Sequence, residues 1–164
     1  MIPVARDRKY YFEDFVPDSV WETDGPTLTE KDIVEFGLKY DPQYFHVDDE
    51  AAKRSPYGGL IASGWQTVSL CMRMTCDSHL LDSASLGSPG VDKLRWIRPV
   101  RPGDSLRMRM TVLSATPSQS KPDRGTIFNR WEIFNQHDEL VMVMEGYGII
   151  ARRGAKPDST RGAA

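Results

Sequence analysis

The chain has 164 residues, 40% of them hydrophobic, and carries 21 basic against 23 acidic residues for a formal net charge of -2. This length and apolar content predict one domain with one sizeable core. The near balance of charge gives no electrostatic reason to expect nucleic acid or an anionic membrane as a partner. Because the first residues contain no apolar run, no secretory signal or membrane-spanning helix is expected, and a cytoplasmic location is predicted.

The two ends of the chain differ from the rest in composition. The tail is too polar to pack, and the first ten residues look similarly loose. Residues 1–10 and 153–164 are therefore expected to be flexible, and residues 11–152 to form the single domain.

The cysteines, Cys71 and Cys76, fall within one predicted helix, where a spacing of five residues turns their side chains in different directions. Neither belongs to a CxxC pair or lies near a histidine at ligand spacing. They are interpreted as small buried apolar residues, and neither a disulfide nor a metal site is expected from them.

Two helices are predicted before residue 90. Thr29, with an acid three residues later, caps the first, and Ile33 and Gly37 contribute to one apolar or closely packed face. This helix should end before Pro42, because proline disfavours helical geometry in the residue that precedes it. The second begins at Gly64, runs to about residue 80 and is apolar on most sides, which predicts that it is buried.

From residue 92 onward the pattern predicts a run of strands separated by turn-rich breaks. The expected strands are 92–97, 105–115, 125–135 and 140–150. Alternation supports the assignment, since Leu106 and Met108 share one face of the second strand while Arg107 points the other way. Several antiparallel strands and one buried helix predict an α+β fold in which a curved sheet wraps a central helix.

Asp41 and His46 are the first candidates for chemistry. They lie five residues apart on a stretch that contains Pro42 and is expected to be non-helical, so both can face one cleft. A carboxylate accepts a proton and an imidazole accepts or donates one near neutral pH, so the pair could hold and activate a water molecule. The alternative is structural: an aspartate that accepts a backbone amide, and a histidine packed at a turn.

A glycine-rich stretch, residues 58–64, leads directly into the second helix. Glycine lets a ligand approach the backbone closely. The amide of Gly64 would then point from the helix N-terminus at a carbonyl oxygen, where the helix dipole stabilises negative charge. Such a site suits an enolate. The alternative is simply a tight loop before a helix.

Three segments, in this order, resemble one known family. Residues 40–52 are similar to the hydratase motif of MaoC-like dehydratases and (R)-specific enoyl-CoA hydratases, in which an aspartate and a histidine five residues apart flank a water molecule. Residues 55–65 resemble the family's loop into its central helix, and residues 94–104 its strand-and-turn segment. The resemblance covers about residues 11–152. It implies a hot-dog fold, an antiparallel sheet wrapped around a central α-helix, and a homodimer whose sheets join edge to edge.

Carried onto this chain, the family pattern makes Asp41 and His46 the catalytic pair and the Gly64 amide the oxyanion donor. The substrate-binding residues that it implies are Gln43, Tyr44, Gly59, Ile61, Ala62, Ser63 and Trp65. All of them come from the first two of the three segments.

Two positions depart from the family pattern. The family commonly has Asn-Pro where this chain has Gln43-Tyr44, and a histidine where it has Ser63. We expect Tyr44 to reshape the acyl pocket and Ser63 to leave room or a hydroxyl beside the thioester. These differences bear on the substrate more than on the reaction.

The implied reaction is the reversible addition of water to a trans-2-enoyl thioester, which gives an (R)-3-hydroxyacyl thioester and requires no metal or redox cofactor. The thioester is expected to be linked to coenzyme A. The coenzyme's phosphates could meet four basic residues of the same region: Lys93, Arg95, Arg98 and Arg101. One alternative is a hot-dog thioesterase, but such enzymes usually carry a carboxylate near the central helix, and here no acid precedes Asp77 in that helix. The other is a non-catalytic subunit that binds acyl thioesters.

Overall fold

The computed structural model describes residues 8–154, so the two terminal segments expected to be flexible lie largely outside the described residues. The parts of those segments that are described are attached to the domain. The Tyr10 amide donates to the Asp82 carbonyl at 3.1 Å, and the Arg153 guanidinium contacts the Asp14 carboxylate at 2.6 Å. The domain thus extends slightly beyond the expected bounds at both ends.

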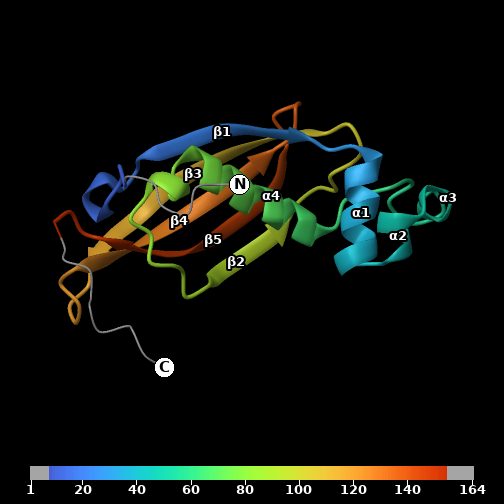
Figure 1. Ribbon diagram of the computed structural model, residues 1–164. Helices are drawn as coiled ribbons and strands as arrows, with labels where there is room; N and C mark the ends of the chain where they lie inside the picture. Colours follow the sequence, from blue (N-terminus) through green and yellow to red (C-terminus); the bar gives the residue numbers. More distant parts are fainter. Residues whose placement is uncertain (1–7, 155–164) are drawn as a thin grey trace, which may run out of the picture.

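Five antiparallel strands form one sheet in the order β1-β3-β4-β5-β2 (Figure 1). They are β1 (Val20–Thr27), β2 (Val91–Trp96), β3 (Ser105–Pro117), β4 (Arg124–Phe134) and β5 (Leu140–Ala151). The last four are the predicted strands, displaced by two residues at most. Consecutive strands β3, β4 and β5 pair as hairpins, and β1 and β2 form the two edges.

Strand β1 lies in a region for which the sequence predicts no strand. It contains Asp24-Gly25-Pro26, a combination typical of a turn. In the structure the register of β1 against β3 shifts between Asp24 and Thr27. Because β1 is an edge strand, a proline at this irregularity is tolerated.

Four α-helices lie between β1 and β2 in the chain: α1 (Glu30–Tyr40), α2 (Tyr44–Val47), α3 (Asp49–Ala52) and α4 (Gly64–Ser78). A short 3-10 helix, η1 (Phe12–Asp14), precedes β1, and another, η2 (Leu80–Asp82), follows α4. Helix α4 lies across one face of the sheet, which curves around it, while α1, α2 and α3 gather beyond one end (Figure 1). This is the α+β hot-dog arrangement. No helix within residues 8–154 is long and apolar enough to cross a membrane.

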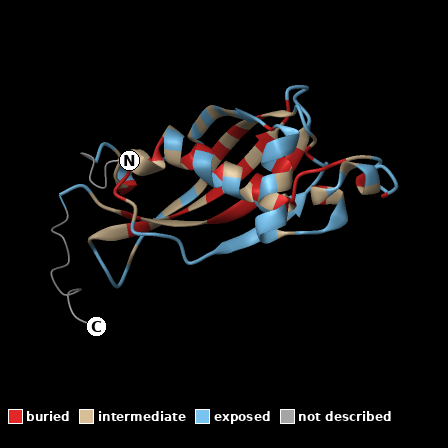
Figure 2. Cartoon of the chain, turned by 45° about the vertical axis from the view of Figure 1, so that its right-hand side comes forward, coloured by how far each residue is buried: buried red, intermediate tan, exposed pale blue. Residues whose placement is uncertain are grey.

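The core lies between α4 and the sheet. Met108 and the residues that alternate with it on β3 face inward as predicted, and Cys71 and Met74 of α4 belong to the same buried cluster. The prediction that α4 is buried is wrong for its outer side, where Trp65 and Met72 are 58% and 48% exposed. Figure 2 shows exposed and half-buried residues along this side of the helix. A single sheet covers only one side of a helix, so the outer side of α4 forms surface in the single chain.

Helix α1 has the predicted start and end. The Asp32 amide donates to the Thr29 hydroxyl at 3.1 Å, and the Thr29 amide donates to the Asp32 carboxylate at 2.8 Å, which completes a capping box. The helix ends at Tyr40, two residues before Pro42. Its length therefore places Asp41 at the helix exit.

Candidate active site

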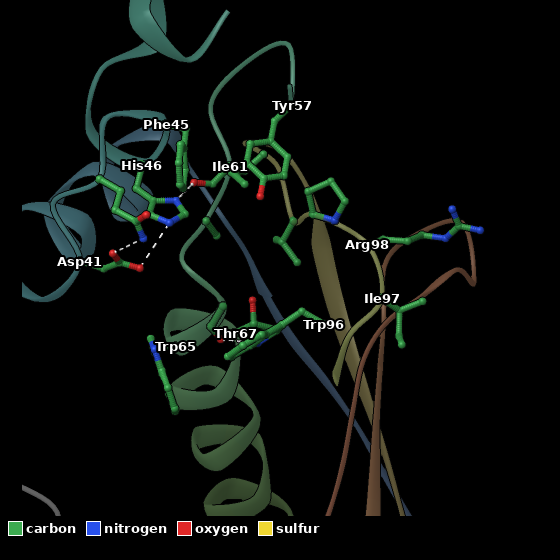
Figure 3. Close-up of a pocket in the computed structure, with 15 residues that line it drawn as sticks. Asp41, Phe45, His46, Tyr57, Ile61, Trp65, Thr67, Trp96, Ile97 and Arg98 are labelled. Atoms are coloured by element: carbon green, nitrogen blue, oxygen red, sulfur yellow. Dashed lines mark hydrogen bonds and ion pairs between the residues drawn. The ribbon is translucent and has the colours of Figure 1, made fainter. Parts of the chain in front are cut away.

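A cavity of about 470 Å³ lies at the N-terminal end of α4 (Figure 3). Its walls come from the chain around α2, from the loop that leads into α4, and from the end of β2 with the residues that follow. Seven of the ten residues predicted to form the site line it: Asp41, Gln43, His46, Ile61, Ala62, Gly64 and Trp65. The three sequence segments therefore meet at one place.

The other three predicted residues do not line the cavity. Ser63 is fully buried behind its wall, and Gly59 lies in the preceding loop. Tyr44 is largely exposed, with its ring packed edge-on against Phe45. Since Phe45 does line the cavity, Tyr44 touches the pocket only indirectly.

Several lining residues were not singled out from the sequence. They are Phe45, Tyr57, Thr67, Trp96, Ile97, Pro99 and Val100. Most belong to the strand-and-turn segment, in which the sequence indicated only the basic side chains as candidates. The adjacent apolar residues Trp96 and Ile97, at the end of a strand, could have indicated this wall. Large apolar side chains at a strand end usually pack against another part of the protein or a ligand.

Helix α1 delivers Asp41 to the cavity. The Asp41 amide donates to the Gly37 carbonyl at 2.9 Å and closes the last turn. The carboxylate accepts one hydrogen bond from Gln43 Nε2 at 2.8 Å and another from Ser63 Oγ at 2.7 Å. Each carboxylate oxygen is therefore held by its own donor.

His46 lies on α2, which corrects the expectation of a non-helical stretch. Its Nδ1 is 2.7 Å from the carbonyl oxygen of Ile61. Because a carbonyl oxygen only accepts, Nδ1 carries the proton, and in the neutral ring Nε2 presents a lone pair. This Nε2 lies 3.3 Å from Asp41 Oδ2 (Figure 3). The buried imidazole is thus fixed in one tautomer with its basic nitrogen beside the carboxylate.

Two opposing effects act on the pKa of Asp41. Partial burial raises it, but the hydrogen bonds from Gln43 and Ser63 and the attraction of His46 lower it by more. The net result is a pKa below the usual range for an aspartate. Asp41 is therefore a carboxylate at neutral pH and a weak base.

Ser63 connects this carboxylate to α4. As N-cap of the helix, its hydroxyl accepts the Trp65 amide at 3.2 Å while donating to Asp41. The Ser63 carbonyl accepts the amides of Gln66 and Thr67. One residue thus satisfies three of the first four N–H groups of the helix.

The remaining N–H group is that of Gly64, which makes no hydrogen bond within residues 8–154. Gly64 lines the cavity, so this amide is available to a ligand at the positive end of the helix dipole. The loop before it is anchored, because the Ala62 amide donates to the Val100 carbonyl at 2.8 Å.

The lack of a side chain at Gly64 also serves a contact within the protein. Trp96 Nε1 donates to the Gly64 carbonyl at 2.9 Å, and a Cβ at Gly64 would overlap the indole ring. Trp65 meets the same ring edge-on. Part of the space beside Gly64 that was predicted for a ligand is therefore occupied by the Trp96 ring.

Of the four basic residues considered for phosphate binding, only Arg98 lines the cavity. Lys93 is paired with Glu145 at 3.0 Å, and the Arg101 guanidinium donates to the Tyr57 carbonyl at 2.6 Å. Arg98 approaches Glu139 no closer than 3.8 Å and is half exposed. It is the cation best placed to meet a charged group at the cavity mouth.

The family model of the MaoC like domain matches residues 14–127. A MaoC-like dehydratase from Rhodospirillum rubrum is 36% identical, with a TM-score of 0.82 over 88% of this chain and 99% of that one. The 3-hydroxyacyl-thioester dehydratase Z of Mycobacterium tuberculosis is 30% identical over 71% of this chain and 78% of its own length. The uncharacterized protein YdeM of Bacillus subtilis is 28% identical over 82% and 92%. The chain belongs to the MaoC-like domain family.

Proposed function

We propose that the protein is a hydro-lyase that adds water reversibly to a trans-2-enoyl thioester and forms an (R)-3-hydroxyacyl thioester. One observation carries the proposal: Asp41 Oδ2 and His46 Nε2 lie 3.3 Å apart at a cavity whose wall includes the free amide of Gly64. The names of relatives, among them a 3-hydroxyacyl-thioester dehydratase, support the same reaction class.

The hydrogen bonds of the two side chains support one division of roles. When the Nδ1–H of a neutral His46 donates to Ile61, Asp41 Oδ2 and His46 Nε2 both present lone pairs to the cavity, so a water molecule held against both from the cavity side can donate one hydrogen to each and turn its own lone pair toward the β-carbon. In this proposal His46 Nε2 takes the proton, since an imidazole is a better base near neutral pH than an aspartate carboxylate. Asp41 then stabilises the imidazolium. Nε2 returns the proton to the α-carbon, which completes the addition.

The thioester carbonyl would lie against the Gly64 amide. As the water oxygen bonds to the β-carbon, the double bond shifts toward the carbonyl and negative charge develops on the thioester oxygen. The Gly64 N–H and the dipole of α4 stabilise this enolate. The substrate thus spans the cavity from its water-holding wall to the helix N-terminus.

The test is turnover of crotonyl-CoA, followed by loss of absorbance of the conjugated double bond. We expect Asp41→Asn and His46→Gln each to lower kcat by about 10²–10⁴-fold. His137→Gln, a change in an exposed turn, is the matched control and should retain parental activity. Parental rates in both site variants would refute the assignment.

The same assay separates the alternatives. Release of free coenzyme A, read with a thiol reagent, would identify a thioesterase instead of a hydratase. Binding of crotonyl-CoA without any change in the double bond would identify a non-catalytic subunit. Hydrolysis is disfavoured because hot-dog thioesterases usually carry a carboxylate near the central helix, and the α4 residues that line the cavity, Gly64, Trp65 and Thr67, include none.

We further propose that two copies associate through β2. This edge strand and the adjacent flank of α4 expose large apolar side chains, namely Val91, Trp96, Trp65 and Met72. An unpaired edge with apolar neighbours is a surface that another chain can cover. Because Trp65 and Trp96 also line the cavity, such a partner would lie beside the substrate.

A further inference from the structure

The hydroxyl of Thr67 has no hydrogen-bond partner within helix α4. Serine and threonine side chains in a helix can donate to the carbonyl four residues earlier, and Ser69 and Thr75 of the same helix do so, each at 2.8 Å. For Thr67 that carbonyl belongs to Ser63 and already accepts the amides of Gln66 and Thr67. The Thr67 hydroxyl makes no hydrogen bond within residues 8–154.

Thr67 is buried, and its hydroxyl can be reached from the cavity around Asp41 and His46. The residue is 3% exposed, and it lines this cavity at the end formed by α4 (Figure 3). It lines neither the cavity at the other end of α4 nor the one between α1 and α4. Its oxygen is not among the unpartnered side-chain atoms that the described chain seals from solvent. A buried hydroxyl without a hydrogen bond is destabilising, so a group in this cavity is needed to complete its bonding.

The Thr67 hydroxyl and the Gly64 amide lie on the same part of the helix surface. Residues three apart are neighbours on a helix, and the bond from Cα to Cβ tilts toward the helix N-terminus. Thr67 lies about 4.5 Å further along the axis than Gly64, so its side chain extends back toward the level of the Gly64 amide. Both residues line the cavity, and neither group donates to a protein acceptor in the described chain. Two free donors therefore meet the cavity at the N-terminus of α4.

The proposed catalytic pair has the reverse hydrogen-bonding character. Asp41 Oδ2 and His46 Nε2 both offer lone pairs, which suits the two hydrogens of a water molecule. Two donors instead suit an oxygen that accepts two hydrogen bonds. In an enoyl thioester this is the carbonyl oxygen, which becomes negatively charged as water adds to the β-carbon, and hydrogen bonds to a charged acceptor are the stronger ones.

We propose that the thioester oxygen accepts two hydrogen bonds, one from the Gly64 amide and one from the Thr67 hydroxyl. Thr67 is then a second catalytic donor to the enolate, in addition to the backbone amide. It keeps its own proton throughout and forms no covalent bond. This role rests on the proposed hydration reaction.

Two variants of Thr67 separate its hydroxyl from its shape. Thr67→Val keeps the branched side chain and removes the hydroxyl, whereas Thr67→Ser keeps the hydroxyl. In crotonyl-CoA turnover we expect Thr67→Val to lower kcat by about 10²-fold with little change in KM, because the bond gains strength as charge develops. Thr67→Ser should retain most of the parental kcat. Ser69→Ala removes an exposed hydroxyl from the same helix and is the matched control, with parental kinetics expected.

The stability of Thr67→Val distinguishes this role from a structural one. Because the hydroxyl is bonded to no protein atom, its removal should not lower the midpoint of urea unfolding. A hydroxyl that holds the fold together would lower that midpoint when removed. A less stable Thr67→Val with parental kcat would therefore assign the hydroxyl to the fold and overturn the proposal.

Butyryl-CoA tests the contact without the reaction, because this saturated thioester has no double bond to hydrate. With ¹³C at the thioester carbonyl, its infrared band is identified by difference from the unlabelled ligand. Hydrogen bonds to a carbonyl lower its stretching frequency, so the band should move to lower frequency on binding. We expect a smaller shift in Thr67→Val than in the parent or Thr67→Ser.

The outcomes for the two proposals can be told apart. An equal band position in all three proteins, or no saturable binding of butyryl-CoA by the parent, would overturn the assignment of Thr67. A parent that does not hydrate crotonyl-CoA but shows the band shift that depends on Thr67 would refute the proposed reaction. The hydrogen bond from Thr67 to a bound thioester would then stand without it.

Discussion

At the scale of single residues, Ser63 makes two hydrogen bonds of different function through one hydroxyl. Its hydroxyl accepts the first capped amide of α4 and donates to the carboxylate of Asp41. The sequence departs from the family pattern here, and Ser63 was expected to leave room or a hydroxyl beside the thioester. Instead, Ser63 lies behind the wall and acts on the electrostatics of the site.

Removing this hydroxyl should raise the pKa of Asp41. In Ser63→Ala the carboxylate loses one of the hydrogen bonds that lower its pKa, while the burial that raises it remains. The cap is lost as well, at about 1 kcal/mol of stability. A ¹³C NMR titration of the Asp41 carboxyl measures the shift. Ser69→Ala, which removes an exposed hydroxyl from the same helix, should leave the titration of Asp41 as it is.

His79 should make the protein sensitive to mild acid. Burial lowers its pKa from 6.5 to about 4, so between these pH values the unfolded chain binds a proton that the folded chain does not. Stability therefore falls as the pH drops from 6.5 to 4, by on the order of 3 kcal/mol from this group. Urea unfolding across this range should show a shallower pH dependence in His79→Gln than in the parent. The same pH dependence of stability in His79→Gln as in the parent would show that His79 does not cause the acid sensitivity. His137→Gln, at an exposed histidine, is the control.

At the scale of elements, the packing of α1 against α2 positions the proposed catalytic pair. Gly37 is buried in α1, and a Cβ there would lie 2.9 Å from Val47 Cγ1 and 3.0 Å from the His46 carbonyl oxygen. The two helices carry Asp41 and His46 respectively. The approach of the helices thus sets the distance between the carboxylate and the imidazole.

Gly37→Ala should separate the helices and misplace the pair. Misplacement by about 1 Å can cost about 10²-fold in rate, so we expect kcat for crotonyl-CoA to fall at least ten-fold while the far-ultraviolet circular dichroism is retained. Leu38→Ala alters the exposed neighbour on the same helix and is the control. Equal rates in the two variants would mean that the packing of α1 on α2 does not govern the reaction.

The elements that the sequence predicted well are those with a strong local pattern. Strands β3 and β4 alternate clearly, and the capping box of α1 is contained within four residues. Strand β1 was missed because its Gly25-Pro26 pair has the local signature of a turn, and only pairing with β3 makes it a strand. Pairing between strands that are distant in the sequence cannot be inferred from the local residue pattern.

The same distinction applies to the site. Asp41 and His46 were identified because five residues suffice to bring them together. The hydrogen bonds of Ser63 with Asp41 and of Trp96 with Gly64 could not be predicted, since each joins residues far apart in the chain. The choice of Nδ1 for the His46 proton likewise depends on the carbonyl of a distant residue.

At the scale of the whole molecule, the two edges of the sheet are unequal. Val20 on β1 and Val91 on β2 are 52% and 53% exposed. The exposed apolar residues of α4 adjoin β2, since Trp65 meets the Trp96 ring edge-on and Met72 lines the same cavity as Val91. We therefore propose β2 as the edge through which the protein dimerises.

A lysine at each edge tests this proposal. Val91→Lys should convert a dimer to a monomer, because a charged side chain at a paired edge opposes strand pairing. Val20→Lys, at the same exposure on the opposite edge, should leave the dimer intact. Light scattering coupled to size-exclusion chromatography reads the mass directly. A parent protein that runs as a single chain, or a dimer broken by Val20→Lys alone, would exclude β2 as the interface.

Ile61 contributes to the site through both its side chain and its backbone carbonyl. Its side chain lines the cavity, whereas its carbonyl oxygen accepts the Nδ1 proton of His46. A substitution at this position changes the side chain and leaves the carbonyl, because every amino acid has the same backbone carbonyl group. Natural variation or laboratory evolution can therefore reshape the proposed acyl pocket at this position while the hydrogen bond that orients His46 is kept.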